Sequence, residues 1–380
     1  MRLVYVLLSP TFGMHQYTAH YANMLAAHGH EVHLVTTGQA VRDRYATAVT
    51  IHTPINNRST GLALETLRWS EMRRAFKTIT ALQPDLVHFG GPHLWNVPLV
   101  LQLKRHSIPI IHTIHDLDPH TGTRFGSLLH LWNKVIMRSS DHILLHGQCY
   151  RQRLINQGTA PEKITYAPIL HLFLSYQEAL NLTKNPQPVQ NDPFILFFGR
   201  LEKYKGIDDL LTAYTKVLAS NVVNNPMRLV LAGRGQLSAP WLHQLPSGVE
   251  LHNYLIEDME AVELFRCCSL VVLPYIDATQ SALVAAAYYF HKPVLVTRSG
   301  ALPEYIEPGK TGFLVDTAAP DQLAEALQAA FEKPQKLVEM GVNGRHWYDT
   351  QRQKEYSTII TMYQQSTGKK PVVYPAKVLV

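Results

Sequence analysis

Short, continuous runs of apolar residues alternate with helical patterns along most of the chain. The first run, 3–8, is typical of a strand that is buried on both faces of a sheet. A loop with Gly13 follows, then a stretch up to His28 with apolar side chains at helical spacing, then a second apolar run at 30–37. A strand, a helix and a second strand in this order predict a parallel sheet.

The same alternation continues to about residue 300. It predicts strands at 84–89, 108–116, 141–147, 194–199, 227–233, 269–275 and 292–297. Helical patterns lie around 206–220, 257–267 and 280–290, and a long one lies at about 336–366. Residues 181–193 are polar, contain three prolines and show no periodicity, which indicates a linker.

This pattern predicts an α/β protein with two Rossmann-like, doubly wound domains that face each other across a cleft. We expect the N-terminal domain at 1–183 and the C-terminal domain at 184–350. The last segment, 351–380, is expected to cross back to the N-terminal domain because its helix is long.

Composition narrows the class of protein. With 380 residues, 46% hydrophobic and 17% charged, the chain is an ordinary globular protein, which excludes disorder or a low-complexity array as the main architecture. Its three cysteines cannot form a disulfide framework, so we expect a reducing, cytoplasmic location. No run reaches the roughly 18 to 20 apolar residues that span a bilayer, so any membrane contact is expected to be peripheral.

The net charge of +6 is unevenly distributed. Residues 1–180 carry 16 Lys and Arg against 10 Asp and Glu, and the remaining 200 residues are balanced. A basic face on the first domain suits a phosphate-rich substrate or the inner face of an anionic membrane, and it also suits plain solubility. Nucleic acid is not among the expected partners.

The string GRLEKYKG, 199–206, carries the clearest chemistry. It lies directly after a predicted buried strand and directly before a predicted helix. Glycine lets the backbone approach a ligand, and Arg200 and Lys205 place two cations near a helix N-terminus, where anions are favoured. The string therefore indicates a diphosphate site, and the alternative is a strand-to-helix turn with two solvated charges.

A second string, 278–304, follows the strand that ends at Pro274. Small residues at Thr279, Ser281 and Ala282 open a helix, so their backbone N–H groups are placed to hold phosphate oxygens, and Gln280 adds a side-chain donor. An ordinary buried helix crossover is the alternative.

Together these strings resemble the C-terminal half of retaining nucleotide-sugar glycosyltransferases of family 4, which have the GT-B fold. The ordered motifs are GRLEKYKG, the TQS loop, an Ala-rich helix, HKPVLVT and SGALPEYIEPGKTGFLV. The first half is similar as well, through the Gly13 loop, GHEVHLVTT, PDLVHFGG and the HD pair of TIHDLDPH.

The resemblance implies roles for residues of the second domain. Arg200 and Lys205 would neutralise the donor diphosphate and the charge that develops on the leaving group. The loop from Thr279 through Gln280 and Ser281 to Ala282 would bind sugar and phosphates, and the backbone near Leu255 would meet the base.

In the first domain the resemblance places Gly13, with Met14 and His15, near the phosphates and the acceptor. His115 and Asp116 would lie beside the transferred sugar, and a histidine that is hydrogen-bonded at a strand end is the structural alternative for His115.

One departure from the family pattern concerns two glutamates that the family commonly has eight positions apart. Ala278 and Ala286 stand at those places, and alanine cannot make the contacts to sugar and ribose hydroxyls. Two lost charge-assisted hydrogen bonds would weaken donor binding by about 1.5 to 3 kcal/mol each.

Other features indicate less. The chain has 20 histidines but none at HExxH or similar spacing, so no metal site is expected. Arg68, Arg73, Arg74 and Lys77 share a segment with apolar residues, which fits either a basic amphipathic helix on an anionic leaflet or a normal surface helix.

The main hypothesis is a retaining, metal-independent glycosyltransferase that moves a hexose from a nucleotide diphosphate sugar. The expected donor is a UDP-sugar such as UDP-glucose, no cofactor is needed, and the acceptor is a glycan or a lipid-linked molecule in polysaccharide biosynthesis. A second hypothesis is a non-catalytic relative that binds a nucleotide sugar or a partner enzyme. An NAD-dependent enzyme is disfavoured because the loop after the first strand lacks GxGxxG.

Overall fold

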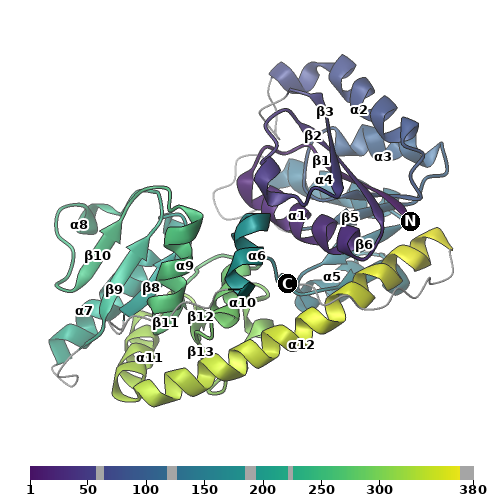
Figure 1. The fold of residues 1–380 in the computed structure, drawn as a ribbon. Coiled ribbons are helices and arrows are strands. Elements are labelled where there is room, and N and C mark those ends of the chain that lie inside the picture. The colour runs from purple at the N-terminus through teal and green to yellow at the C-terminus, as the bar shows by residue number, and fades with distance from the viewer. Residues whose placement is uncertain (57–63, 118–125, 185–193, 221–225, 369–380) are drawn as a thin grey trace. The chain divides into compact units, whose positions relative to one another are not determined.

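The computed structural model describes residues 1–56, 64–117, 126–184, 194–220 and 226–368. The described residues form two compact units. Unit 1 comprises the described parts of Met1–Pro119, Thr123–Pro186 and Gln353–Val380, and unit 2 comprises those of Gln187–Arg352. Figure 1 shows the elements of both units along the chain.

Unit 1 is built on a seven-stranded sheet with the order β3-β2-β1-β4-β5-β6-β7, and every pairing is parallel. Its strands are β1 (Arg2–Leu7), β2 (Glu31–Thr37), β3 (Val49–Ile55), β4 (Leu86–Phe89), β5 (Ile110–Thr113), β6 (His142–Leu145) and β7 (Ile164–Tyr166). Its helices are α1 (Phe12–Ala27), α2 (Trp69–Ala81), α3 (Asn96–Lys104), α4 (Gly126–Ser139), α5 (Gln148–Asn156) and α6 (Tyr176–Lys184), with 3₁₀ turns η1 (Arg42–Arg44), η2 (Leu64–Leu67) and η3 (Pro161–Lys163).

Alternation along β1 divides the core of unit 1 into two layers. Leu3, Tyr5 and Leu7 pack with side chains of α1 on one face of the sheet. Val4 and Val6 pack on the other face with side chains of α2, α3 and α4. A strand that is apolar on both faces is what a doubly wound sheet requires.

Unit 2 has a six-stranded parallel sheet with the order β10-β9-β8-β11-β12-β13. Its strands are β8 (Phe194–Phe198), β9 (Arg228–Ala232), β10 (Val249–His252), β11 (Leu270–Leu273), β12 (Val294–Thr297) and β13 (Gly312–Val315). Its helices are α7 (Ile207–Ser220), α8 (Ala239–Leu242), α9 (Asp258–Cys267), α10 (Ala282–Tyr289) and α11 (Pro320–Glu332), with 3₁₀ turns η4 (Lys203–Lys205) and η5 (Leu302–Tyr305).

The last helix, α12 (Pro334–Thr367), begins in unit 2 and ends in unit 1. In unit 2 it approaches α10 closely, since a Cβ added at Gly344 would lie 2.3 Å from the ring of Tyr288. In unit 1 its Glu355 meets His20 at 2.8 Å, and its Tyr356 ring stacks on His28 with the ring centroids 3.6 Å apart. Helix α12 is thus packed into the cores of both units along its length.

Every strand predicted from an apolar run is present, as are the helices predicted in the second half of the chain. Two predictions need correction. Helix α1 begins at Phe12, so Gly13 lies in its first turn rather than in a loop, because the Thr11 carbonyl already accepts hydrogen bonds from Met14 and His15 at 3.1 and 3.2 Å. The predicted linker starts later than 181, because α6 runs to Lys184, and its remainder, 185–193, lies outside the described residues.

Candidate functional site

Both sheets reverse their strand order once, and open α/β sheets bind ligands at the carboxyl ends of the strands at such a point. In unit 2 the reversal lies between β8 and β11. The string 199–206 follows β8 and the string from 278 follows β11. The two strings that the sequence singled out therefore flank one topological switch point.

The turn after β8 is pinned to the loop after β11. Gly206 has φ +69°, and a Cβ there would lie 1.8 Å from the carbonyl oxygen of Pro274, so only glycine fits. The Tyr204 carbonyl accepts a hydrogen bond from the Ile276 amide at 2.8 Å. These contacts hold the first string against the segment 274–276, which leads into the second string.

The two cations of the turn have different partners. Arg200 donates to the Glu202 carboxylate at 2.8 Å and to the Tyr204 hydroxyl at 2.9 Å. The ammonium of Lys205 lies 3.6 Å from the ring centroid of Tyr275 and 5.1 Å from that of Tyr204, within cation–π range. Burial raises the pKa of Tyr204, and the charges of Lys205 and Arg200 act against this shift.

Lys205 is therefore held by cation–π contacts with Tyr275 and Tyr204 rather than by an ion pair. Among the described residues no carboxylate lies within ion-pair distance of its ammonium. A cation held by a buried ring keeps its charge for an incoming anion.

The loop that opens α10 is fixed through its backbone. The Ala278 amide donates to the Ser299 hydroxyl at 2.8 Å, and the Thr279 carbonyl accepts from the Ala301 amide at 2.9 Å. Ser281 caps the helix by accepting from the Leu283 amide at 3.3 Å. The first amides of α10 point out of the helix end and have no partner inside the helix, which suits an anion.

The two alanines of the family departure are buried. Ala278 is 6% exposed in this loop, and Ala286 is 1% exposed within α10. Neither side chain offers a polar atom, so contacts to sugar or ribose hydroxyls at these places must come from other groups.

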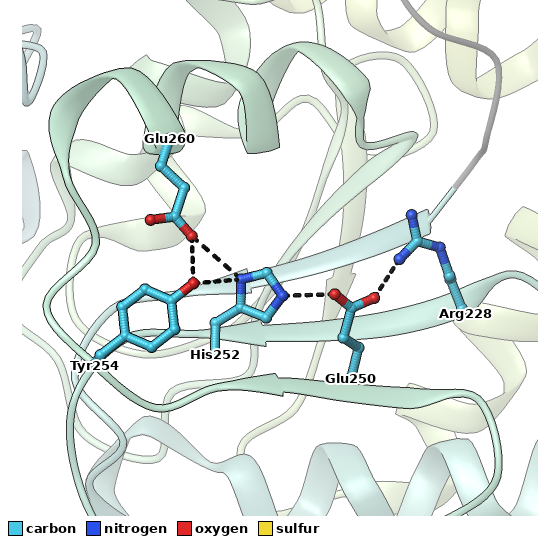
Figure 2. Close-up of polar contacts among 5 residues, drawn as sticks. All are labelled: Arg228, Glu250, His252, Tyr254 and Glu260. Atoms are coloured by element: carbon cyan, nitrogen blue, oxygen red, sulfur yellow. Dashed lines mark hydrogen bonds and ion pairs between the residues drawn. The ribbon is translucent and has the colours of Figure 1, made fainter.

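Leu255 lies in the segment between β10 and α9, and it is 75% exposed. A polar network flanks this segment. Figure 2 shows its members, which are Arg228, Glu250, His252, Tyr254 and Glu260.

His252 is the centre of this network. It meets Glu250 at 2.6 Å through Nε2 and Glu260 at 3.3 Å through Nδ1. The Tyr254 hydroxyl donates to Glu260 at 2.7 Å, and Arg228 pairs with Glu250 (Figure 2). The hydrogen bond from His252 and the charge of Arg228 lower the pKa of Glu250. Through Tyr254 and Glu260 the network ties the end of β10 to the start of α9 and braces the segment that carries Leu255.

In unit 1 the sequence-predicted residues lie at the carboxyl ends of β1 and β5. Gly13 lies in the first turn of α1, and a Cβ there would meet nothing within 4 Å, so its surroundings are open. His115, buried at the end of β5, donates from Nε2 to the Gly90 carbonyl at 2.9 Å, and Asp116 follows it. Burial lowers the pKa of His115, while the Gly90 hydrogen bond and Asp116 act in the opposite direction.

His15 is buried, and its Nδ1 lies 2.8 Å from the Tyr45 hydroxyl. Burial lowers its pKa to about 4. Its neighbour Met14 is half-buried beside the core of the same face.

A buried chain of hydrogen bonds runs behind this edge. Its links join hydroxyls and imidazoles from three strands, two helices and the residue after β6 with one backbone carbonyl, at 2.5 to 3.0 Å. In order the members are Tyr5, Tyr363, His88, Thr113, Tyr17, His146 and the carbonyl of Ala167.

The direction of every link follows from the carbonyl at its end. A carbonyl only accepts, so His146 Nδ1 carries the proton toward Ala167, and its Nε2 accepts from the Tyr17 hydroxyl because the ring is neutral. Burial lowers the pKa of His146 to about 3, which keeps it neutral. The Tyr17 oxygen then accepts from Thr113, and Thr113 accepts from His88 Nε2.

The remaining two links reach α12. With its proton on Nε2, His88 accepts at Nδ1 from the Tyr363 hydroxyl at 2.7 Å, and Tyr363 accepts from Tyr5 at 2.5 Å. Burial lowers the pKa of His88 and raises those of both tyrosines, so all three are uncharged. A single set of protons satisfies the whole chain, and it ties the last helix to the strand ends where Tyr17 packs edge-on against His115 at 4.5 Å.

The sequence analysis did not single out the tyrosines of either site. Tyr204 was signalled only by its place inside the string 199–206, and Tyr275 lies three residues before the string 278–304. Tyr363 lies 275 residues beyond His88 and 358 beyond Tyr5, the two residues that it joins. Their roles depend on packing between distant segments.

The described residues bring no three His, Cys, Asp or Glu side chains into an arrangement that could hold a metal ion. No described helix has both the length and the apolar character needed to cross a membrane. Cys149, Cys267 and Cys268 are all free thiols.

Comparison with known proteins identifies the two halves. Residues 12–169 match the family model described as glycosyl transferase 4-like domain, and residues 192–333 match that of the glycosyl transferases group 1. The D-inositol 3-phosphate glycosyltransferase of Gordonia bronchialis is 24% identical over 367 residues, which cover 88% of this chain and 79% of that protein.

Solved structures share the fold. The sucrose-phosphate synthase of Thermosynechococcus elongatus superposes with a TM-score of 0.72 at 18% identity, covering 96% of this chain and 99% of that one. The Anabaena protein HepE, solved in complex with UDP, superposes with a TM-score of 0.69 at 16% identity, covering 96% and 98%.

Both sheets, the two family matches and these neighbours agree with the α/β architecture predicted from the sequence. The chain belongs to the family-4-like glycosyltransferases with the GT-B fold.

Proposed function

We propose that this glycosyltransferase is a retaining, metal-independent enzyme that moves a hexose from a UDP-sugar, such as UDP-glucose, to a glycan or lipid-linked acceptor. The observation that carries the proposal is the contact between the turn 199–206 and the segment 274–276, which leads into the loop 278–282, at the switch point of unit 2. This contact puts two cations and a helix N-terminus at one edge of a sheet, which suits a diphosphate. The complex of the HepE protein with UDP supports the choice of base.

Lys205 and Arg200 neutralise the donor diphosphate in this proposal. Lys205 is held by the Tyr275 ring, so its ammonium is positioned before the ligand arrives. The backbone amides from Thr279 to Ala282, with the side chains of Gln280 and Ser281, hold phosphate and sugar oxygens. The backbone at Leu255 meets the uracil.

Unit 1 supplies the groups for the sugar and the acceptor. Gly13 leaves open space at the start of α1 for phosphates or acceptor. His115 donates its Nε2 proton to the Gly90 carbonyl, and this bond fixes the ring at the strand end. Asp116 follows it at the strand end.

The proposed reaction is a front-face substitution. The acceptor hydroxyl oxygen forms a bond to the anomeric carbon while the bond from that carbon to the diphosphate oxygen breaks. The acceptor proton passes to the leaving diphosphate, and the two cations stabilise the negative charge that develops there. No protein nucleophile takes part, and the anomeric configuration is retained.

The proposed setting is polysaccharide biosynthesis in the cytoplasm, at the inner face of the membrane. The three free cysteines suit a reducing compartment, and the basic first half of the chain suits an anionic surface.

Donor turnover tests the proposal. Purified protein is assayed with UDP-, GDP- and ADP-sugars by release of the nucleoside diphosphate, with and without EDTA, and NMR assigns the anomeric configuration of the product. We expect Lys205→Ala and Arg200→Ala each to lower kcat/KM by about 100-fold or more. The matched control is Lys216→Ala, which removes an exposed cation of α7 that is paired with Asp321 of α11. Undiminished turnover in both site variants, loss of activity in EDTA, or an inverted product contradicts the mechanism.

A non-catalytic relative that binds a nucleotide sugar or a partner enzyme is the alternative, and the buried Ala278 and Ala286 favour it. Calorimetry with UDP and UDP-glucose, combined with the turnover assay, separates the two. The alternative predicts binding that Lys205→Ala abolishes, without turnover of any acceptor.

A further inference from the structure

A second basic site lies in unit 1, in a pocket between α4 and α5 of about 620 Å³. Four cations line it, and none of its described lining residues is acidic; the cations are Lys134, Arg138, Arg153 and Lys163. The volume falls within the range of small-molecule sites, about 300 to 1,000 Å³.

Helix electrostatics explain only part of this cluster. Arg138 and Arg153 lie in the last turns of α4 and α5, where cations stabilise the carbonyl end of a helix. Lys134 lies one turn earlier on α4, and Lys163 lies outside both helices, before β7. These two cations have no such role, and among the described residues neither forms an ion pair. No contact with the described residues therefore offsets the repulsion of Lys134 and Lys163 by the other cations of the pocket.

The remaining residues that line the pocket include both neutral polar and buried apolar side chains. Asn133, Gln157 and Thr159 contribute polar side chains, and Leu117 and Met137 are buried apolar residues. Asn133 also donates to the carbonyls of Asp116 and Leu117 at 3.2 and 3.1 Å, so its side chain is fixed.

The far rim is a rigid turn. The amide of Gly158, which has φ +92°, donates to the Ile155 carbonyl at 2.9 Å, and the Thr159 amide donates to the Leu154 carbonyl at 3.0 Å. These bonds occupy the last carbonyls of α5, so the helix end next to the cations is capped within the protein.

We propose that this pocket binds a phosphate-bearing group with two or more negative charges, at a site separate from the edge that holds the nucleotide sugar. Guanidinium and ammonium groups bind phosphate oxygens by charge-assisted hydrogen bonds, and the neutral polar side chains suit the remainder of the ligand. The group is either the headgroup of an anionic lipid or a soluble phosphorylated molecule. The inference does not depend on the donor or mechanism proposed above.

The test uses the full chain with pyrophosphate as the probe and hydrogen–deuterium exchange as a local readout. Pyrophosphate is expected to slow exchange in peptides of α4 and α5, and a separate effect at 199–206 reports the nucleotide edge. The double variant Lys134→Gln/Lys163→Gln is expected to weaken the α4–α5 effect at least about tenfold, with the effect at 199–206 unchanged. Arg42→Gln/Arg105→Gln removes the same charge from exposed positions of the same unit and serves as the control.

A vesicle arm identifies the source of the phosphate. Vesicles that contain an anionic phospholipid are sedimented with each variant at physiological salt. If the Lys134/Lys163 variant alone fails to co-sediment, the ligand is a lipid headgroup. If that variant co-sediments unchanged but loses the pyrophosphate effect, the ligand is soluble. No pyrophosphate effect at α4 and α5 in the unmodified chain, or an equal effect in the double variant, overturns the proposal.

Discussion

Acid should destabilise unit 1 far more than unit 2, because unit 1 buries its histidines as neutral rings. All of the fully buried histidines among the described residues lie in unit 1, and the described histidines of unit 2 are exposed or half-buried. Burial lowers the pKa of His112 and His146 to about 3 and that of His15 to about 4. In the unfolded chain each would titrate near the ordinary value of about 6.5.

The sign follows from proton uptake. Below pH 6.5 the unfolded state binds protons that the folded state does not, so the free energy of unfolding falls as pH falls from about 6.5 toward 3 to 4. Each of these three rings lowers the free energy of unfolding by about 1.4 kcal/mol when the pH falls from 7.5 to 5.5. Their sum, about 4 kcal/mol, is a large share of the 5 to 15 kcal/mol that stabilises a typical domain.

Hydrogen exchange at pH 7.5 and 5.5, corrected for the intrinsic pH dependence of exchange, measures both units in one sample. The slowest amides of β1, β4 and β5 should lose about 4 kcal/mol of protection, and those of β8, β11 and β12 much less. In His112→Gln the loss in unit 1 should shrink by about 1.4 kcal/mol, whereas His106→Gln, at an exposed position, should leave it unchanged. Equal protection of unit 1 at the two pH values would refute the assignment of neutral buried rings.

Three substitutions test the contacts described above. Gly206→Ala should cost about 2 kcal/mol or more in urea unfolding of unit 2, because a Cβ would lie 1.8 Å from a carbonyl oxygen, and Gly309→Ala, with a similar φ of +77° in open space, should cost less. Tyr363→Phe should lower the stability of unit 1 by about 1 to 3 kcal/mol in the same assay, since it removes the donor to a buried imidazole nitrogen. Tyr275→Leu should weaken UDP binding by about 2- to 30-fold in calorimetry through loss of the ring under Lys205, and Tyr275→Phe should bind like the unmodified chain.

The strands that the sequence did not predict are all edge strands. β3 and β7 close the sheet of unit 1, and β10 and β13 close that of unit 2. An edge strand is covered on fewer sides, so it needs no continuous apolar run, and these four are short or half-exposed, as in the pattern of VELH at Val249–His252. Central strands are apolar on both faces, which is why their pattern alone was sufficient to find them.

Some features of the candidate site depend on residues that are close together in the sequence, and others depend on contacts between distant segments. Arg200 and Lys205 were predictable because a glycine, a cation and a strand end are close together in the sequence. The Tyr275 ring that holds Lys205 is seventy residues away, and the pairing of β8 with β11 brings it there. The sequence could indicate which charges lie near the strand end, but only the packed sheet shows what positions them.

With Ala278 and Ala286, the presentation of backbone amides by the loop can be considered apart from the recognition of sugar hydroxyls. The loop before α10 keeps its conformation through backbone bonds from Ala278 to Ser299 and from Ala301 to Thr279, so its ability to present amides does not depend on a carboxylate at 278. A glutamate at 278 or 286 would add selectivity for hydroxyls, and its absence leaves charge and backbone as the means of holding a donor. The proposed diphosphate contacts at this edge therefore do not depend on the two missing carboxylates, and in the proposal selection among sugars would come from the acceptor side or from Gln280 and Ser281.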